Sequence, residues 1–363
     1  MQPLVALLWV NYNSMPIIDV VLDSLRSIEE LDYDNYVLIA VDNASTDGSW
    51  EKLLERIEAA RRKGLRVITV QLAVNSGFTG GMNAAYRLAL KLGARYVAVL
   101  NNDAAPFNKS IEMLVEFMEQ HPCVGSVQGA VLYYGEDRVQ TAGNYLSELL
   151  TAHLAFEGLR PGELPRKPYH ITYASGAYAL YRVKAVKEAR RDQRLFDDWV
   201  FAYFDDNAIG LALWGAGYRV VGVPRPAGWH VMSATFKRQG PRRLYLTSRG
   251  HLLAAHVSAS KYRAVVEASY LRRLAYYASL EAAGAVALGS AAAIARAIRD
   301  ARKQAHRVAA RHTIRKGYAT APILHVKSME ATMYMLSGTP LTRLLYRRAA
   351  ALAARHVFDG CDK

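Results

Sequence analysis

The first 120 residues predict an α/β fold, in which helices flank a mostly parallel, doubly wound Rossmann-like sheet. Short runs of apolar residues alternate with helix-length stretches that carry a single apolar stripe. The apolar runs lack the alternation of a half-exposed strand and are typical of strands buried on both faces. Strand–helix units repeated in this way are characteristic of parallel sheets.

The first two units can be followed residue by residue. Leu4–Val10 is the first expected strand. Pro16, whose fixed φ suits a first helical turn, opens a helix with an apolar stripe down to Ile28. Tyr36–Val41 is the second strand. Asp47 to Ser49 can cap the next helix, and Gly64 ends it.

The pattern continues and then becomes less regular. Leu65–Val70 is the third strand, and a Gly-rich turn leads from it into a helix over Met82–Leu92. Tyr96–Leu100 is the fourth strand, followed by a helix near Ser110–Gln120. Beyond it we expect strands over Val124–Tyr134, Ile171–Arg182 and Tyr218–Val223, a turn at Pro224–Pro226, a loop over Arg160–Pro168 and a helix over Phe204–Trp214.

Polar residues follow each of the first four strands. They are Asn11–Asn13, Asp42–Asn43, Asn75 and Asn101–Asp103. Open α/β sheets bind ligands at the carboxyl ends of their strands. The sequence therefore predicts that these four clusters form one ligand site.

Charge divides the chain into two regions. The 363 residues carry a formal net charge of +14. Residues 1–236 hold 23 basic and 26 acidic side chains, a net charge of −3, whereas residues 237–363 hold 23 and 6, a net charge of +17. We therefore expect a ligand-binding domain over 1–236 and a basic region over 237–363. Its excess charge indicates an anionic partner, such as lipid headgroups, phosphates or nucleic acid.

The basic region is rich in Ala and Arg and is predicted to be helical. Leu274–Ala295, interrupted only by Glu281, is long enough to cross a bilayer, and eight Arg and Lys residues follow it up to Lys316. Tyr318–Pro340 and Leu341–Phe358 could be interfacial helices or weak spans. We expect association with a membrane here. The alternative is a soluble helical subdomain with a solvated basic face.

Composition limits the other classes of site. Cys123 and Cys361 are too few for a disulfide framework or a Cys-rich zinc site. The first apolar run has no basic leader, so we expect no secretory signal and a mature chain that begins inside a cell.

Candidate metal ligands follow two strands. Divalent cations prefer carboxylate oxygen, and a metal that holds a diphosphate needs a protein anchor that leaves positions open. Asp103 suits this role, with Asn101 as a neutral neighbour, and His230 could complete the site. The alternatives are a polar turn that caps the next helix and a structural histidine.

Other candidates could contact a nucleotide or move a proton. Asp42 could accept hydrogen bonds from a nucleobase or ribose. Asp205 and Asp206 begin an apolar helix, where one could act as general base, although helix capping would also explain them. The glycines after Asn75 let backbone approach a ligand. Their spacing fits neither a Walker loop nor a dinucleotide fingerprint.

Eight motifs occur in a fixed order. They are Asn11-Tyr12-Asn13, Val41 to Ser49, Asn75 to Asn83, Leu100-Asn-Asn-Asp103, Ser175-Gly-Ala177, Tyr203-Phe-Asp-Asp206, Gly217-Tyr218 and Trp229-His230. This set resembles the family 2 glycosyltransferases of the GT-A fold, in particular their rhamnosyltransferase-like and mannosyltransferase-like branch. The resemblance covers about residues 4–235.

The resemblance implies an inverting, metal-dependent transfer of a sugar from a nucleotide diphosphate donor. Asp206 would be the catalytic base, and Asp103 and His230 would hold Mn²⁺ or Mg²⁺. The donor-binding positions would be Asn13, Asp42, Asn75, Gly77, Gly81, Asn101 and Arg242.

Two positions depart from the family's pattern. Asn101 stands at the first Asp of the DxD motif, which removes one charge. The usual Glu-Asp-x-Asp is here Asp205-Asp-Asn-Ala208, which favours Asp206 over Asp205 as the base. Gln239-x-x-Arg242 faintly resembles a motif of processive synthases, with Arg243 in place of the usual Trp. These arginines could neutralise a leaving diphosphate or meet lipid headgroups.

We therefore expect an enzyme of glycan biosynthesis that transfers mannose from GDP-mannose to a lipid-linked or polyprenyl-phosphate acceptor. The alternatives are a rhamnosyltransferase or another UDP- or dTDP-sugar transferase, and a nucleotidyltransferase. A nucleic-acid-binding protein ranks last, because the Arg-rich region lacks interleaved aromatic residues and a recognition motif. The expected location is the cell membrane, with the catalytic domain on its cytoplasmic side.

Overall fold

The computed structural model describes residues 2–231, 240–337 and 342–361. Its first elements follow the predicted order closely. They are β1 (Val5–Asn11), α1 (Ile18–Glu29), β2 (Tyr36–Asp42), α2 (Ser49–Arg62), β3 (Val67–Gln71), α3 (Gly77–Lys91), β4 (Tyr96–Asn101) and α4 (Ser110–Gln120). The main difference is α3, which begins at Gly77, so the Gly-rich segment forms the first turns of the helix.

The second part of the sheet is built from β6 (Val124–Tyr133), β11 (Tyr178–Arg182) and β12 (Arg219–His230), with α5 (Val183–Arg190) and α6 (Asp205–Gly215) between the last two. The prediction of one strand over Ile171–Arg182 was wrong, because only its last five residues are extended in the sheet. The turn expected at Pro224–Pro226 lies within β12, where register shifts against β6 absorb it. Short strands that we did not predict are β5 (Ala104–Pro106), β7 (Val139–Thr141), β8 (Asn144–Ser147), β9 (Ala152–Leu154) and β10 (Tyr169–His170).

The main sheet is mixed rather than mostly parallel. Its order is β10-β12-β6-β11-β4-β1-β2-β3, with β5 and β7 attached at β12 and β6. The strands from β4 to β3 are parallel, as predicted. β11, however, runs antiparallel to both of its neighbours, β4 and β6.

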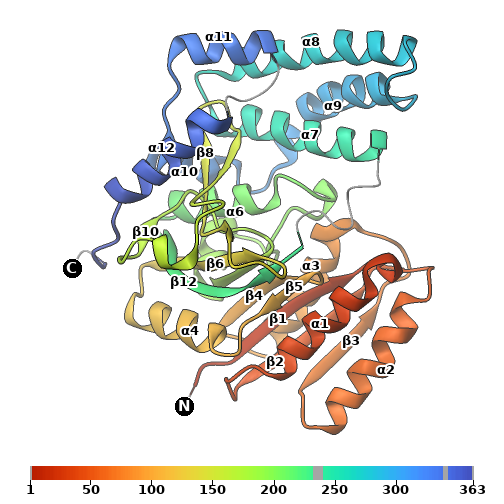
Figure 1. Ribbon diagram of the computed structural model, residues 1–363, viewed down its shortest axis with the longest axis vertical. Helices are drawn as coiled ribbons and strands as arrows, with labels where there is room; N and C mark the ends of the chain where they lie inside the picture. Colours follow the sequence, from red (N-terminus) through yellow and green to blue (C-terminus); the bar gives the residue numbers. More distant parts are fainter. Residues whose placement is uncertain (1, 232–239, 338–341, 362–363) are drawn as a thin grey trace.

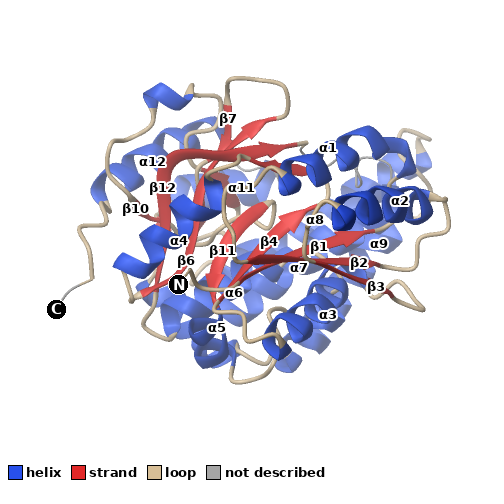
Figure 2. Cartoon of the chain, turned by 90° about the horizontal axis from the view of Figure 1, so that it is seen from below, coloured by secondary structure: helices blue, strands red, loops and turns tan. Residues whose placement is uncertain are grey.

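Helices cover both faces of this sheet (Figure 2). Alternate residues of β1 separate the two cores: Ala6 and Leu8 pack with α3, whereas Leu7 and Trp9 pack with α1 and α2. Both sets are buried. This explains why the strand is apolar at every position, and it confirms the central α/β prediction.

The C-terminal region is helical, and most of it forms the end of the molecule opposite α1 and α2 (Figure 1). It contains α7 (Gly240–Ser258), α8 (Arg263–Ala282), α9 (Ser290–Gln304), α10 (Arg311–Thr320), β13 (Ile323–Leu324), α11 (Ser328–Ser337) and α12 (Thr342–Arg355). The stretch that is long enough to cross a bilayer, Leu274–Ala295, is divided between α8 and α9. A turn with Gly284 and Gly289 at positive φ separates them. Among the described residues, none of the helices combines the length and the apolar character needed to cross a membrane.

This region packs closely onto the first part of the chain. Helices α6 and α10 cross at Gly215 and Gly317, and a Cβ on Gly317 would lie 1.7 Å from the Leu211 carbonyl oxygen. Only glycine permits so close an approach of the α6 and α10 backbones. β13 also pairs with β8.

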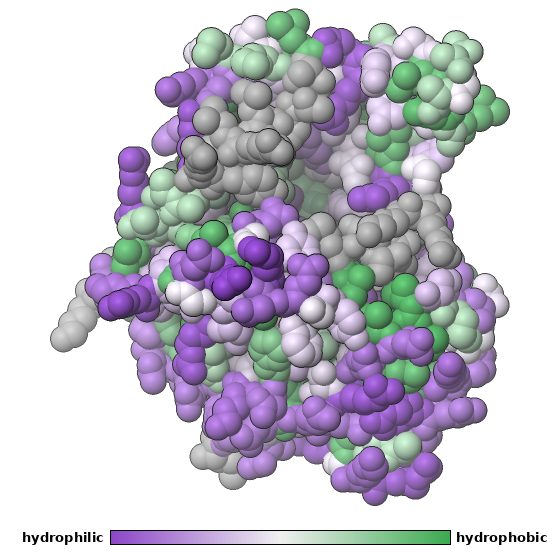
Figure 3. All heavy atoms as spheres, viewed as in Figure 1, coloured by the Kyte–Doolittle hydropathy of each residue, from purple (hydrophilic) through white to green (hydrophobic). Residues whose placement is uncertain are grey.

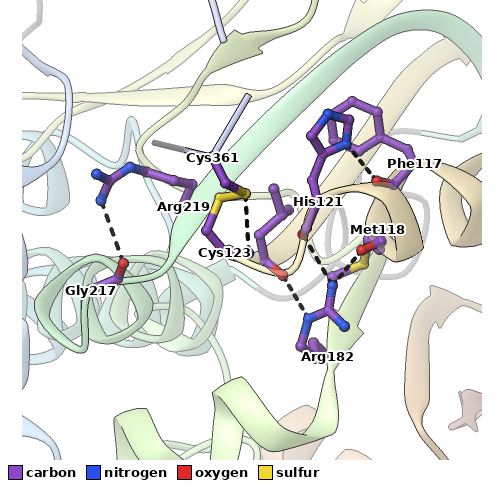
Figure 4. Close-up of a disulfide and its surroundings, with 9 residues drawn as sticks. Phe117, Met118, His121, Cys123, Arg182, Gly217, Arg219 and Cys361 are labelled. Atoms are coloured by element: carbon purple, nitrogen blue, oxygen red, sulfur yellow. Dashed lines mark hydrogen bonds between the residues drawn. A yellow bond between two sulfur atoms is a disulfide. The ribbon is translucent and has the colours of Figure 1, made fainter. Parts of the chain in front are cut away.

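A disulfide makes a further connection (Figure 4). Cys123, just before β6, is bonded to Cys361 near the C-terminus, across 238 residues. The nearby Arg182 guanidinium donates to the carbonyl oxygens of Val124 and Met118. Two cysteines are indeed too few for a framework, but they form one long-range covalent link.

Candidate active site

A cavity of about 290 Å³ lies beyond the carboxyl ends of β1, β2 and β4. Seven predicted site residues line it: Asn75, Gly77, Asn101, Asp103, Asp206, His230 and Arg242. Three others lie outside its lining: Asn13, Asp42 and Gly81. Segments more than 100 residues apart in the sequence thus meet at the strand ends.

One part of the cavity holds Asp103 and His230. Asp103 follows β4, His230 ends β12, and both are largely buried. The His230 Nε2 atom lies 3.2 Å from Asp103 Oδ1 and 3.4 Å from the Asn101 side-chain nitrogen. The antiparallel pairing of β5 with β12 brings these positions together, because it aligns Ala104 with His230.

Gln140 fixes the orientation of this histidine. Its Nε2 donates to the His230 carbonyl oxygen at 3.1 Å, and its Oε1 lies 2.7 Å from His230 Nδ1. Since a carbonyl oxygen can only accept, the amide nitrogen must face it and the amide oxygen must face Nδ1. The Nδ1 atom therefore carries a hydrogen. A neutral His230 then presents the Nε2 electron pair to the Asp103 carboxylate.

Two electron-pair donors that face each other at this distance need a proton or a cation between them. The pair fits a divalent metal: imidazole nitrogen and carboxylate oxygen suit Mn²⁺, and Gln140 supplies the second-sphere hydrogen bond common at ligating histidines. The described residues contain no group of three or more His, Cys, Asp or Glu placed to hold a metal. A metal held by this pair would keep most of its positions for oxygen atoms of a ligand.

The loop after β1 and the loop after β2 are joined by hydrogen bonds. Asp42 is fully buried and accepts hydrogen bonds from the Asn11 side chain at 3.0 Å and from the Ser45 hydroxyl at 2.6 Å. Asn13, at a positive φ of 46°, accepts from the Thr46 backbone at 2.8 Å. The structure thus places Asp42 and Asn13 where they order these loops, rather than among the residues that face the cavity.

The glycines of α3 divide in the same way. Gly77, with φ at +77°, lies against Phe201, whose carbonyl oxygen would be 2.5 Å from a Cβ there. Gly81 instead packs on Val10 of β1. Asn43, just after β2, holds the segment after β3 at the cavity wall. Its side-chain nitrogen donates to Asn75 Oδ1 at 3.1 Å and to the Gly77 carbonyl oxygen at 2.9 Å.

The carboxyl pair at the start of α6 lines another part of the cavity. Asp206 accepts hydrogen bonds from the backbone N–H groups of Asn207 and Gly176, and it is more exposed than the buried Asp205. Burial raises the pKa of both carboxyls, and the charge of Asp206 raises that of Asp205 further. The two carboxyls repel each other's charge, and water can stabilise the ionised form of the more exposed Asp206 better than that of Asp205.

The backbone just before this pair is strained. Phe201, Tyr203 and Phe204 all have positive φ, at 73°, 63° and 82°, although none is glycine. Such conformations persist only where the surroundings hold them, and they are common at functional sites. Arg242 on α7 lies over the Phe201 ring, 4.7 Å from its centroid, and Arg249 donates to the Val200 carbonyl oxygen. Gln239, the other predicted motif residue, lies outside the described residues.

Sequence reasoning missed Gln140, named Asn43 only as part of a polar cluster, and gave no role to Ser175–Ala177. The last of these lines the cavity, and the Ser175 backbone donates to Gln128 Oε1 at 2.7 Å. The place of Asn43 directly after a strand was the signal that put it in that cluster. Gln140 had no such signal, because it lies in an unpredicted three-residue strand.

Comparisons with known proteins show that the chain is similar to glycosyltransferases. TuaG of Bacillus subtilis (strain 168), a glycosyltransferase named for teichuronic acid biosynthesis, is 30% identical over 128 residues, which are 35% of this chain and 47% of TuaG. EpsE of the same organism, also named as a glycosyltransferase, is 26% identical over 200 residues, 54% of this chain and 66% of EpsE. The chain thus matches about half to two thirds of these relatives' length.

The fold has counterparts among solved structures. The crystal structure of GalNAc-T7 with UDP, GalNAc and Mn²⁺ is similar to this chain, with a TM-score of 0.60 and 15% sequence identity. The match covers 89% of this chain and 60% of the GalNAc-T7 chain. That similarity supports the GT-A architecture. The model of the glycosyl transferase family 2 matches residues 8–190, from β1 through α5, which is half of the chain. The chain therefore belongs to glycosyl transferase family 2.

Proposed function

We propose that the protein is an inverting, metal-dependent glycosyltransferase that uses a nucleotide diphosphate sugar. One observation carries the proposal: a single cavity is lined both by the Asp103–His230 pair and by the Asp205–Asp206 pair. The first pair suits a metal-bound diphosphate, and the second suits removal of a proton. Both are needed when a hydroxyl displaces a nucleotide diphosphate.

Asp103 and His230 would hold the divalent metal, Mn²⁺ or Mg²⁺. When bound, the metal supplies positive charge to the diphosphate leaving group. Gln140 keeps Nε2 of His230 turned toward Asp103. Arg242, at the cavity wall, adds a cation that can pair with a phosphate oxygen.

Asp206 would act on the acceptor. As the more exposed member of the carboxyl pair, it accepts the proton of an attacking hydroxyl while the sugar's bond to the diphosphate breaks. A single displacement of this kind inverts the anomeric centre. If the acceptor is a phosphate, which is already ionised, Asp206 orients it instead.

The donor and acceptor are the finer part of the proposal. We propose mannose from GDP-mannose, passed to a lipid-linked or polyprenyl-phosphate acceptor in glycan biosynthesis. The family and the naming of TuaG for a glycan pathway support glycan biosynthesis. The excess of basic residues after residue 236 supports an anionic acceptor at a membrane surface.

Thermal-shift measurements with nucleotide diphosphates test the donor site. A ligand that binds only the native state raises the melting temperature. We expect GDP to stabilise the protein more than UDP or dTDP do, and only when Mn²⁺ or Mg²⁺ is present. The Asp103→Asn variant should lose the metal-dependent part of the shift. A stronger response to UDP or dTDP would move the assignment to another sugar donor, and no response to any of them would reject a nucleotide diphosphate site.

A further inference from the structure

Large apolar side chains are exposed together at the helical end of the molecule. Ten large hydrophobic residues of the described chain are exposed, and six of them lie between α8 and α11. These six are Leu271, Tyr276, Leu288, Met329, Met333 and Leu336, which we call the α8–α11 face. Leu288 is 90% exposed and Met329 71%. In Figure 3, green atoms mark this end of the molecule along its upper edge.

Both helices present an apolar stripe on the side that faces away from the protein. In α11, the exposed Met329, Met333 and Leu336 follow helical spacing, while Ala331 and Tyr334 are buried. In α8, exposed alanines continue the line from Leu271, while Val266 and Tyr270 face inward. α11 packs along α8. A surface helix normally turns polar residues outward, so these stripes lack the polarity expected against water.

The turn between α8 and α9 extends the same surface. Gly284 and Gly289, both at positive φ, bound the segment that carries Leu288. This turn divides the long apolar stretch. The largest side chain of the turn, Leu288, is exposed to solvent. A segment too short to span a bilayer can still insert side chains into its surface.

Charge on this surface favours an anionic partner. Of the acidic groups nearby, Glu267 pairs with Arg302 at 2.7 Å and the buried Glu330 pairs with Arg348 at 2.7 Å. Glu281 accepts a hydrogen bond from the Ala291 backbone at 2.7 Å. Arg272, next to Leu271, is exposed, as is Lys327 at the start of α11. Apolar side chains flanked by exposed cations match the headgroup region of an anionic bilayer.

We propose that the α8–α11 face docks the protein on an anionic lipid surface, with its apolar side chains inserted at headgroup depth. This inference deepens the proposed function: a lipid-linked acceptor would be met at such a surface. The link to an acceptor rests on the proposed function. The docking itself does not require the donor site.

Vesicle flotation tests the proposal with paired variants of the full chain. Point substitutions are preferable to truncation, because α10 packs on α6 and its removal would disturb the catalytic domain. The test variant is Leu288→Glu with Met329→Glu. The matched control is Val74→Glu with Leu92→Glu, two exposed apolar residues on the first part of the chain.

The wild type and the control should float with phosphatidylcholine vesicles that contain about 30% phosphatidylglycerol, and not with phosphatidylcholine alone. The affinity of the test variant for the anionic vesicles should fall by about tenfold. Its nucleotide-dependent thermal shift should be retained. Equal binding by both variants would overturn the proposal. So would a wild type that ignores anionic vesicles. A dimer in light scattering that only the test variant disrupts would assign the face to a second copy instead.

Discussion

Asp206→Asn separates the chemistry of the carboxyl pair from its cost to stability. Asn keeps an oxygen that can accept from the Asn207 and Gly176 backbone, so the local structure should persist. It cannot accept a proton. We expect transfer to a hydroxyl acceptor to fall by about two to four orders of magnitude, with donor and metal binding retained.

The same substitution should stabilise the fold at neutral pH. Burial raises the pKa of Asp206 from 3.8 to about 6, so the native state binds the proton more tightly than the unfolded chain does. Stability due to this group is therefore present at low pH and is lost as pH rises from the unfolded value through about 6. Asn avoids that loss, which corresponds to about 1–3 kcal/mol above this window.

Two assays check this reasoning. Initial transfer rates across pH should show an acid limb near pH 6 in the wild type, because the base must be ionised. Urea unfolding at low and neutral pH should show that the variant's stability advantage appears only at neutral pH. Asp205→Asn should cost much less transfer, since the more buried Asp205 is less available to an acceptor. Near-wild-type transfer in Asp206→Asn, or an equal loss in Asp205→Asn, would refute the assignment.

Three further predictions concern the surroundings of the cavity. Gln140→Leu should weaken Mn²⁺ binding, measured by titration calorimetry, by about 10–100-fold, whereas Gln140→Glu, which keeps an acceptor for Nδ1, should lose less. Gly317→Ala should lower the unfolding free energy by about 1–3 kcal/mol and lower the transfer rate, because the methyl group would collide with α6. Gly162→Ala, with open space around it, is the control, and equal stability of the two variants would contradict the packing. Cys123→Ser should cost about 3–5 kcal/mol in urea unfolding, and a reducing agent should destabilise only the wild type.

The elements that the sequence predicted best are those whose signals are local. Apolar runs in the sequence predicted the strands β1, β2 and β4. An apolar stripe predicted α4 with the bounds that the structure has. Because the carboxyl ends of parallel strands share one edge, placing polar residues after each strand was enough to locate the cavity. Asn75, Asn101 and Asp103 all line it.

What the sequence did not predict depends on distant partners. β11 is antiparallel between β4 and β6, and nothing within its own residues indicates that direction. Ile171–Ala177 resembles a strand in composition, yet the part from Ser175 lines the cavity. Gln140 meets His230 across 90 residues. Leu274–Ala295 is long enough to cross a bilayer, but Gly284 and Gly289 turn the chain there and divide it between two helices.

The C-terminal region holds the segment before the Asp205–Asp206 pair in place, although its charge differs from that of the rest of the chain. Three non-glycine residues with positive φ precede the carboxyl pair, and each costs on the order of 1–3 kcal/mol. α7 supplies Arg242 over Phe201 and Arg249 to the Val200 carbonyl oxygen. α10 presses on α6, the helix that carries Asp206. The change in charge after residue 236 therefore marks a change of surface. The cavity itself is built from both regions, so a substitution in α7 or α10 should alter the base as well as any contact made by the basic surface.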